Sequence, residues 1–195
     1  MRSDTHIRRR DMDFLKKEDS TLVVVDMQEK LMSAMPEIES RLTVKNVRIL
    51  LDAARILGIP IHVTEQYPKG LGPTIGEIRE SAGEEFHPIE KLIFSCARSD
   101  EFMGELKGLG RGSVILCGVE THVCVLQTAI DLVNDGYRVY VPADAVASRK
   151  ELDWEKGIEL MDKAGAVVGT TEAFLFQLLE RAGTDEFKQI SRLVR

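Results

Sequence analysis

From residue 22 onward, short apolar runs rich in β-branched residues alternate with longer stretches that have helical spacing. There are six such runs, and their apolar residues are continuous rather than alternating with polar ones. Continuous apolar strands are typical of a sheet that is covered on both faces. Repeated strand-then-helix units favour a parallel arrangement. The sequence therefore predicts one doubly wound α/β domain of the three-layer, Rossmann-like kind, with a largely parallel six-stranded sheet and helices on both faces.

The boundaries of the expected elements follow from periodicity and from stop signals such as Gly58 and Gly136. The predicted strands are Leu22–Val25, Ile59–Val63, Lys91–Phe94, Val114–Cys117, Tyr137–Val141 and Ala166–Gly169. The predicted helices are Ile38–Leu57, Ser99–Leu109, a helix after Cys124 that reaches Asn134, Leu152–Ala164 and Glu172–Arg181. The segment Tyr67–Gly76 is rich in proline and glycine and is predicted to be a loop.

The length of 195 residues, with 44% hydrophobic and 30% charged residues, is typical of a folded single domain. We expect a polar N-terminal arm over residues 1–20, the α/β domain over residues 21–182 and a C-terminal extension over residues 183–195. The first twenty residues contain six basic and five acidic side chains and no apolar segment. A secretory signal is therefore not expected.

Net charge and cysteine content restrict the partners and the compartment. With 26 basic and 32 acidic residues the formal net charge is −6, so no basic excess is present to bind a nucleic acid backbone. No apolar run approaches the roughly 20 residues of a membrane span. Three cysteines do not make a disulfide framework, and an odd number fits a reducing compartment. We expect a cytoplasmic protein that binds neither nucleic acid nor membrane.

The segment Cys117–Cys124, which reads CGVETHVC, carries the strongest indication of chemistry. A buried strand ends here, Gly118 permits a sharp turn, and a helix begins. A cysteine in the first turn of a helix feels the positive end of the macrodipole, which lowers its pKa and favours the thiolate. Backbone N–H groups of the same turn can receive an oxyanion. Cys124 is thus a candidate nucleophile, although a small buried core cysteine is an open alternative.

Two charged residues are placed at predicted strand ends and can border the same crevice, because ligands of such sheets bind beyond the carboxyl ends of the strands. Asp26 follows four apolar residues, and a partly buried carboxylate there suits a general base. Capping of the following turn is its open alternative. Lys91 could favour a neighbouring thiolate or orient a carboxylate, whereas a lysine at a strand edge commonly points into water.

The motifs VVVDMQ at Val23–Gln28, Lys91 before Phe94-Ser95, and CGVETHVC together resemble the isochorismatase-like cysteine hydrolases. The resemblance runs from about Leu22 to Phe176. It implies a catalytic triad in which Cys124 is the nucleophile, Asp26 takes its proton and Lys91 stabilises charge. It also implies a non-proline cis peptide between Val119 and Glu120, which would aim backbone N–H groups, that of Cys124 included, at the oxyanion. The implied reaction is hydrolysis of an amide or related C–N bond through a covalent acyl-type intermediate, on a small-molecule substrate.

Within this family the stretch Thr64–Gly72, which reads TEQYPKGLG, resembles the isochorismatase-domain-containing branch. Nicotinamidases of the family carry an Asp-x-His pair and a further histidine that bind a metal, and this chain has no such spacing. We therefore expect no catalytic metal and no cofactor. Candidate pocket residues are Gln66, Tyr67, Phe94, Glu120 and His122, each of which loop polarity or ordinary packing explains equally well.

Two other classes of function remain as alternatives. A non-catalytic binding or scaffold protein could keep the hydrolase fold, but the intact triad argues against it. A nucleotide- or flavin-binding domain is the weakest alternative, because the phosphate-binding glycine motifs are absent from the sequence. The resemblance also implies a homo-oligomer, a dimer or larger. The apolar stretch Phe174–Leu179 could serve its interface, and core packing explains this stretch equally well.

Overall fold

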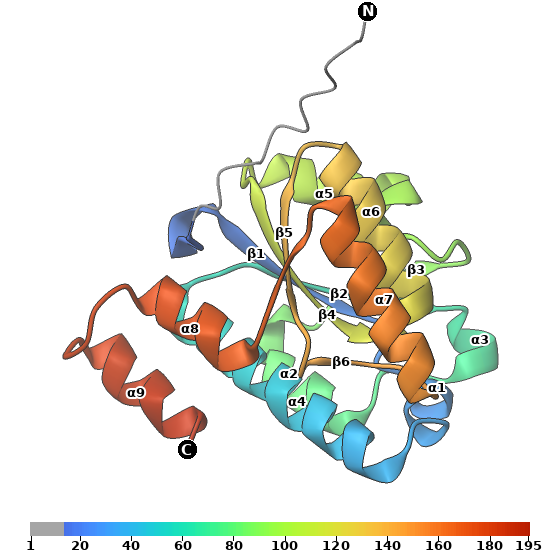
Figure 1. Ribbon diagram of the computed structural model, residues 1–195, viewed down its shortest axis with the longest axis horizontal. Coiled ribbons are helices and arrows are strands. Elements are labelled where there is room, and N and C mark those ends of the chain that lie inside the picture. The colour runs from blue at the N-terminus through green and yellow to red at the C-terminus, as the bar shows by residue number, and fades with distance from the viewer. Residues whose placement is uncertain (1–13) are drawn as a thin grey trace, which may run out of the picture.

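The computed structural model describes residues 14–195, and Figure 1 draws it as a ribbon. Its strands are β1 Ser20–Val25, β2 Ile61–Gln66, β3 Pro88–Lys91, β4 Ser113–Val119, β5 Arg138–Pro142, β6 Val146–Ala147 and β7 Val167–Gly169. Its α-helices are α1 Glu29–Ser33, α2 Glu37–Leu57, α3 Pro68–Leu71, α4 Gly76–Ala82, α5 Asp100–Gly108, α6 Leu126–Asn134, α7 Glu151–Ala164, α8 Thr171–Leu179 and α9 Asp185–Leu193. A π-helical turn over Thr121–Val125 leads into α6.

The strands form one sheet in the order β3-β2-β1-β4-β5-β7, with the short β6 also paired to β4. Every one of these strand pairs is parallel. The chain starts in the middle with β1, moves outward to β3, and then returns to β4 on the other side of β1. This reversal is the topological switch point of a doubly wound sheet, where ligands of such folds bind.

Helices cover both faces of the sheet (Figure 1). Helices α2, α4, α8 and α9 lie on one face and α5, α6 and α7 on the other. Within β1, Leu22 and Val24 belong to the core under α2, whereas Val23 and Val25 belong to the core under α5 and α6. All six residues of β1 are buried, as expected for a strand that lies between two helical layers. The predicted α/β fold class is confirmed, but the sheet has seven strands rather than six, because the two-residue strand β6 was not predicted.

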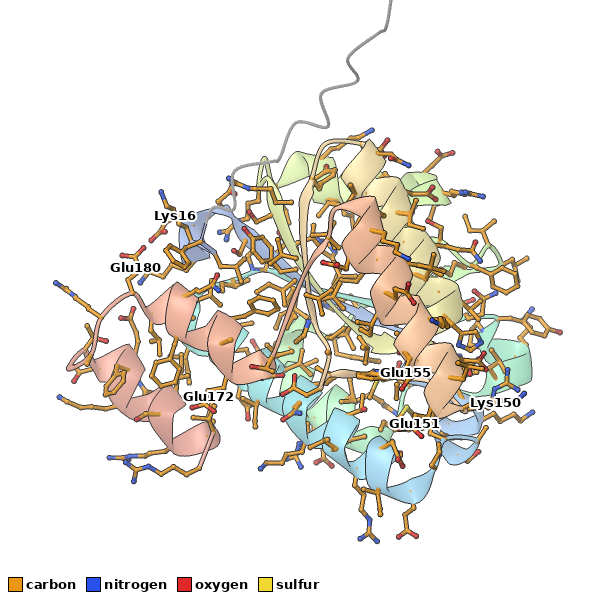
Figure 2. All side chains as sticks on the ribbon, viewed as in Figure 1. Lys16, Lys150, Glu151, Glu155, Glu172 and Glu180 are labelled. Atoms are coloured by element: carbon orange, nitrogen blue, oxygen red, sulfur yellow. The ribbon has the colours of Figure 1, made fainter. Side chains whose placement is uncertain are left out.

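The outer faces of the helices are charged. Figure 2 shows Glu151 and Glu155 projecting from α7 and Glu172 from α8, and all three are exposed. Over residues 14–195 the structure contains no helix that is both long and apolar enough to cross a membrane.

The third strand ends earlier than the sequence predicts. The prediction Lys91–Phe94 is wrong, because β3 ends at Lys91 and the next three residues form a bend. Leu92 is 75% exposed and Phe94 52% exposed, so these side chains do not enter a core. An apolar triplet after a basic residue reads as a strand, but here the backbone turns its carbonyl groups inward and its side chains outward.

In two further predicted segments the difference is larger than the one or two residues by which the ends of helices and strands commonly vary. Strand β2 begins at Ile61 rather than Ile59 and continues through polar residues as far as Gln66. The predicted loop over Tyr67–Gly76 contains helix α3, which has Pro68 in its first turn, and ends where α4 begins. Proline is well suited to the first turn of a helix, since the N–H it lacks would have no helical partner there.

Residues 1–13 of the expected polar arm lie outside the described part of the chain. The segment after residue 182 forms α9, whose Ile190 is fully buried in the core with α2. In the apolar stretch of α8, Phe174 is buried in the core and Phe176 is half exposed. Core packing therefore accounts for most of that stretch.

The close contact between β1 and β4 can be tested by placing a side chain at Gly118. Gly118 has φ +111°, and a Cβ at this position would lie 2.2 Å from the Val25 carbonyl oxygen. Gly118→Ala should therefore lower the free energy of unfolding by roughly 2–4 kcal/mol, measured by urea denaturation. Gly104→Ala in α5 is the matched control, because nothing lies within 4 Å of a Cβ there, and it should raise stability by about 0.5–1 kcal/mol. Equal stability of the two variants would contradict this description of the β1–β4 contact.

Candidate active site

The candidate active site lies at the carboxyl ends of four neighbouring strands. Asp26 follows β1, Lys91 ends β3, and Cys124 lies in the π-helical turn after β4. Because the strands are parallel, all these ends lie at one edge of the sheet. β2, which lies between β1 and β3, contributes Thr64 and Gln66 at its own carboxyl end.

Asp26 is completely buried, and both of its carboxylate oxygens accept hydrogen bonds. Oδ2 lies 2.7 Å from Lys91 Nζ, and Oδ1 accepts from Thr64 Oγ1 at 2.8 Å. The backbone of Asp26 has φ +50°, a left-handed conformation that aspartate tolerates better than most residues. A carboxylate with two fixed donors is held in one orientation.

The Lys91 ammonium is surrounded by acceptors. Besides Asp26, Nζ donates to Gln66 Oε1 at 2.8 Å and to the Phe94 carbonyl at 3.0 Å, with the Ile93 carbonyl at 3.4 Å. Burial is the largest single influence and by itself would lower the pKa of Lys91. The negative charge of Asp26, its hydrogen bond and the neighbouring Cys96 and Cys124 together outweigh burial, so the pKa is raised above its usual value. Lys91 is therefore a permanent cation at neutral pH.

Cys124 is buried, and it lies close enough to Asp26 and Lys91 for both to act on the pKa of its thiol. Burial raises the pKa of its thiol, the charge of Asp26 raises it further, and Lys91 opposes both. The net direction is upward, so the expectation of a pKa lowered by the helix macrodipole is wrong. Desolvation and the neighbouring carboxylate are the two largest causes, and both favour the neutral thiol. At neutral pH the resting side chain is a thiol, and its proton needs an acceptor before sulfur can attack.

The backbone between β4 and α6 turns sharply in front of Cys124. The peptide bond between Val119 and Glu120 is cis. The Glu120 carbonyl accepts from the N–H groups of Val123 at 3.1 Å and of Val125 at 3.2 Å, which lie on either side of that of Cys124. The Glu120 carboxylate is buried and accepts from Arg149 Nε at 2.8 Å, so the side chain of Glu120 is held away from solvent.

The remaining predicted pocket residues have different surroundings. Tyr67 and Phe94 are each about half exposed, at 50% and 52%, whereas Gln66 is buried. His122 Nδ1 lies 2.9 Å from Ser148 Oγ. A cavity of about 340 Å³ is lined by Tyr67, Pro68, Lys69, Glu90, Lys91 and Leu92. This cavity touches Lys91, whose side chain is almost wholly buried, and its lining within the described residues includes neither Asp26 nor Cys124.

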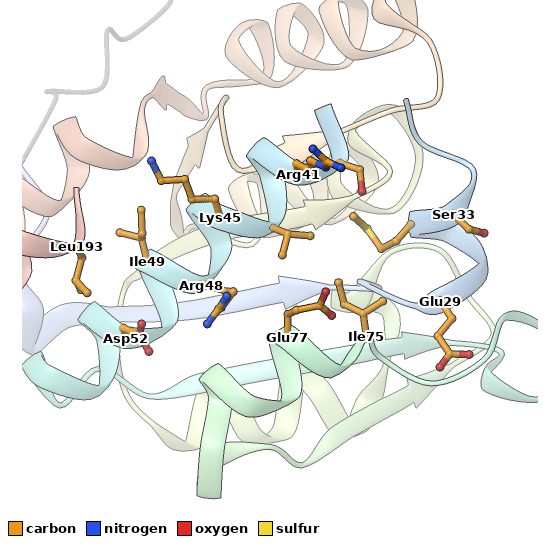
Figure 3. Close-up of a pocket in the computed structure, with 13 residues that line it drawn as sticks. Glu29, Ser33, Arg41, Lys45, Arg48, Ile49, Asp52, Ile75, Glu77 and Leu193 are labelled. Atoms are coloured by element: carbon orange, nitrogen blue, oxygen red, sulfur yellow. The ribbon is translucent and has the colours of Figure 1, made fainter. Parts of the chain in front are cut away.

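A second cavity lies elsewhere on the molecule. It is a groove of about 680 Å³ along α2, and Figure 3 shows Arg41, Lys45 and Arg48 of α2 and Glu77 of α4 among the residues that line it. Over the described part of the chain, its lining includes neither the Asp26–Lys91 pair nor Cys124. The groove is therefore separate from the candidate site, although it is the larger of the two.

Three supporting residues were not found from the sequence. Thr64 binds Asp26, and Cys96 Sγ lies 3.7 Å from the Thr64 hydroxyl. Gln28 joins the first and second strand ends, because its Oε1 accepts from Gln66 N–H at 2.7 Å and its Nε2 donates to the Gln66 carbonyl at 3.0 Å. The feature of the sequence that could have indicated them is a buried strand that continues into polar residues, as β2 does at Thr64 directly after Val63.

Over residues 14–195, no group of three or more His, Cys, Asp or Glu side chains is arranged to hold a metal ion. The three cysteines are free thiols, and all are buried. The chemical resources of the site are thus a thiol, a carboxylate with fixed orientation and an ammonium ion.

Comparisons with known proteins identify the family. A family model described as the isochorismatase domain matches residues 20–173. The chain is 39% identical over 181 residues to isochorismatase domain-containing protein 2 of Danio rerio, which covers 92% of this chain and 89% of that protein.

Solved structures agree with this assignment. The fold is similar to that of a MAR1 ribonuclease from Caenorhabditis elegans, with 39% identity, a TM-score of 0.86 and coverage of 93% and 92% of the two chains. It is also similar to N-carbamoylsarcosine amidase from Thermoplasma acidophilum, with 26% identity, a TM-score of 0.68 and coverage of 81% and 98%. The chain belongs to the isochorismatase family.

Proposed function

We propose that this chain is a small-molecule hydrolase in which Cys124 is the nucleophile, Asp26 the general base and Lys91 a fixed positive charge. One observation carries the proposal: a buried Asp26–Lys91 ion pair, with an N–O distance of 2.7 Å, next to a thiol whose pKa is raised. A protonated thiol beside an oriented carboxylate is one arrangement in which an adjacent general base can activate a cysteine nucleophile.

The proposed reaction proceeds in two halves. Asp26 accepts the thiol proton as Cys124 sulfur attacks the carbonyl carbon, and the carbonyl oxygen becomes an oxyanion. Backbone N–H groups of the turn over residues 119–124 donate to that oxyanion. Asp26 then gives its proton to the departing amine, the C–N bond breaks, and a thioester remains. Water, deprotonated by Asp26, attacks the thioester and releases the acid and the free thiol.

An amide or related C–N bond is the preferred substrate class. The relative from Thermoplasma acidophilum is named as an amidase, and its fold is similar over 81% of this chain. An ester would follow the same two steps, and a vinyl ether would not use the thiol in the same way.

Ribonuclease activity is a second candidate, because the 39% identical relative from Caenorhabditis elegans is named as a ribonuclease. The net charge of −6 does not favour binding of an RNA backbone. A binding or scaffold protein is the third candidate. The cytoplasmic location and the homo-oligomer remain predictions from the sequence.

The role of Asp26 can be tested without a substrate by measuring how fast iodoacetamide alkylates each cysteine. Since the charge of Asp26 raises the pKa of Cys124, alkylation of the Cys124 thiolate should depend on Asp26. Asp26→Asn removes that charge and leaves Lys91 as a cation beside the thiol, so alkylation of Cys124 at pH 7 should become roughly 10-fold faster or more, with a smaller difference above pH 10, where more of the thiol is ionised in both proteins.

Cys117 provides the internal control in the same experiment, because it is completely buried and its thiol donates to the Val23 carbonyl. Its alkylation should be slow in both proteins, and a rise in the variant would report unfolding. Alkylation of Cys124 that is unaffected by Asp26→Asn in the folded protein would refute the assigned general base.

The reaction itself can be tested with a panel of small primary amides, carbamoyl compounds, esters and single-stranded RNA. We expect turnover of one or more amides or carbamoyl compounds, lost by roughly 1000-fold or more in Cys124→Ala, and no cleavage of RNA. Cleavage of RNA that depends on Cys124 would favour the ribonuclease instead. No turnover by a folded protein whose Cys124 is also unreactive would favour the binding protein.

A further inference from the structure

The hydrogen bonds of Lys91 determine what this residue can do in the site. An ammonium group has three N–H donors and no acceptor. The three shortest bonds of Nζ go to Asp26 Oδ2 at 2.7 Å, Gln66 Oε1 at 2.8 Å and the Phe94 carbonyl at 3.0 Å. All three donors are therefore committed to the protein. A substrate could receive a hydrogen bond from Lys91 only if one of these bonds were broken.

The Gln66 amide is fixed in one orientation by what lies at each end of it. Its Nε2 donates to the Leu92 carbonyl at 2.9 Å, and a carbonyl can only accept. Its Oε1 faces the Lys91 ammonium, which can only donate. The opposite amide orientation would place two donors together and two acceptors together, so it is excluded.

The backbone of Gln66 is held as firmly as its side chain. The Gln28 amide binds both the N–H and the carbonyl of Gln66, and Gln28 is itself completely buried. A further bond from Gln28 Nε2 to the Gly72 carbonyl, at 2.6 Å, ties the end of α3 to the same point. Hydrogen bonds thus hold both the backbone and the side chain of Gln66, and its amide connects the Lys91 ammonium to the Leu92 carbonyl after β3.

We propose that Gln66 is a positioning residue: it fixes the Lys91 ammonium against Asp26, and it does not contact the substrate. The inference rests on the proposed function and replaces the expectation that Gln66 lines the pocket. Lys91 in turn acts through Asp26, as a charge held at a fixed place, rather than as a donor to the reacting atoms.

The same arrangement explains the exposed apolar bend after β3. The carbonyl groups of Leu92, Ile93 and Phe94 all point inward, to Gln66 or to Lys91. Their side chains consequently point outward, with Leu92 75% exposed. The backbone of this bend is used as a set of acceptors for the buried cation, because an unpaired N–H on a buried ammonium would destabilise its charged form.

Gln66→Met tests the proposal, since methionine has similar length and no hydrogen-bonding amide. Alkylation of Cys124 by iodoacetamide at pH 9 should become roughly 3–10-fold slower, because Lys91 is no longer held in place. In the Asp26→Asn/Lys91→Met background the same substitution should change the rate by less than about 2-fold. This background replaces the buried ion pair with neutral groups, which limits the loss of stability.

Gln177→Met is the matched control. Gln177 Oε1 accepts from Leu15 N–H at 3.1 Å, so this substitution removes one side-chain bond to the backbone away from Lys91. It should leave the alkylation rate of Cys124 unchanged. Thermal denaturation of both methionine variants identifies any effect that arises from lost stability alone.

A second measurement reports directly on Lys91. Its side-chain NMR signal, assigned with the Lys91→Met variant, can be followed from pH 8 to pH 11. An acceptor that favours the charged form is lost in Gln66→Met, so Lys91 should begin to titrate about one pH unit earlier than in the unsubstituted protein. A purely structural role for Gln66 would not move this titration.

The possible results distinguish failure of the positioning role of Gln66 from failure of the proposed hydrolase function. If Gln66→Met slows alkylation equally in both backgrounds, or leaves the Lys91 titration unchanged, Gln66 does not position Lys91 and the inference is overturned. In that case rapid, Asp26-dependent alkylation of Cys124 would still support the proposed function. If Cys124 of the unsubstituted protein shows no dependence on Asp26, the proposed function itself fails.

Discussion

The buried ion pair between Asp26 and Lys91 is the interaction on which the rest of the site depends. Removing two charges from water is costly, and their attraction offsets that cost only when the remaining donors and acceptors are also satisfied. The structure meets this condition, because Thr64 binds the free oxygen of Asp26 while Gln66 and the Phe94 carbonyl bind the free N–H groups of Lys91. Removing one member of such a pair typically costs about 3–5 kcal/mol of stability. The polar residues at the ends of β1, β2 and β3 are therefore coupled to one another.

The topology of the sheet makes this coupling possible. Asp26 and Lys91 are separated by 65 positions in the chain, yet β1 and β3 are separated only by β2. Parallel pairing brings the carboxyl ends of these strands to one edge, and β4, on the other side of β1, brings the turn that carries Cys124 to the same edge. The close contact of Gly118 with Val25 allows β4 to enter that turn without a side chain between the strands. Backbone geometry thus determines which side chains can meet.

Much of this arrangement could be predicted from the sequence, and the failures have physical causes. The long helix was predicted at Ile38–Leu57 and is found at Glu37–Leu57, because an apolar period of 3.6 residues sustained over that length is specific to an α-helix. The bend after Lys91 was mistaken for a strand, since composition cannot show that carbonyl groups rather than side chains point inward. The role of Gln66 depends on hydrogen bonds to residues about 25 to 38 positions away, which no local pattern contains.

The raised pKa of Cys124 also could not be predicted from the local sequence. The position of a cysteine in a first helical turn indicates the effect of the macrodipole, but it does not show how deeply the thiol is buried or that a carboxylate lies nearby. This pKa is nevertheless consistent with catalysis. With Asp26 ionised, Lys91 protonated and Cys124 a thiol, the three side chains carry no net charge. Ionising the thiol into water would leave a net negative charge in a buried site, which burial opposes. In the proposed mechanism, transfer of the same proton to Asp26 keeps the sum at zero, so Lys91 would stabilise a charge that moves from oxygen to sulfur. A fixed cation is better suited to this role than a mobile donor, because it favours both positions of the charge without itself exchanging a proton.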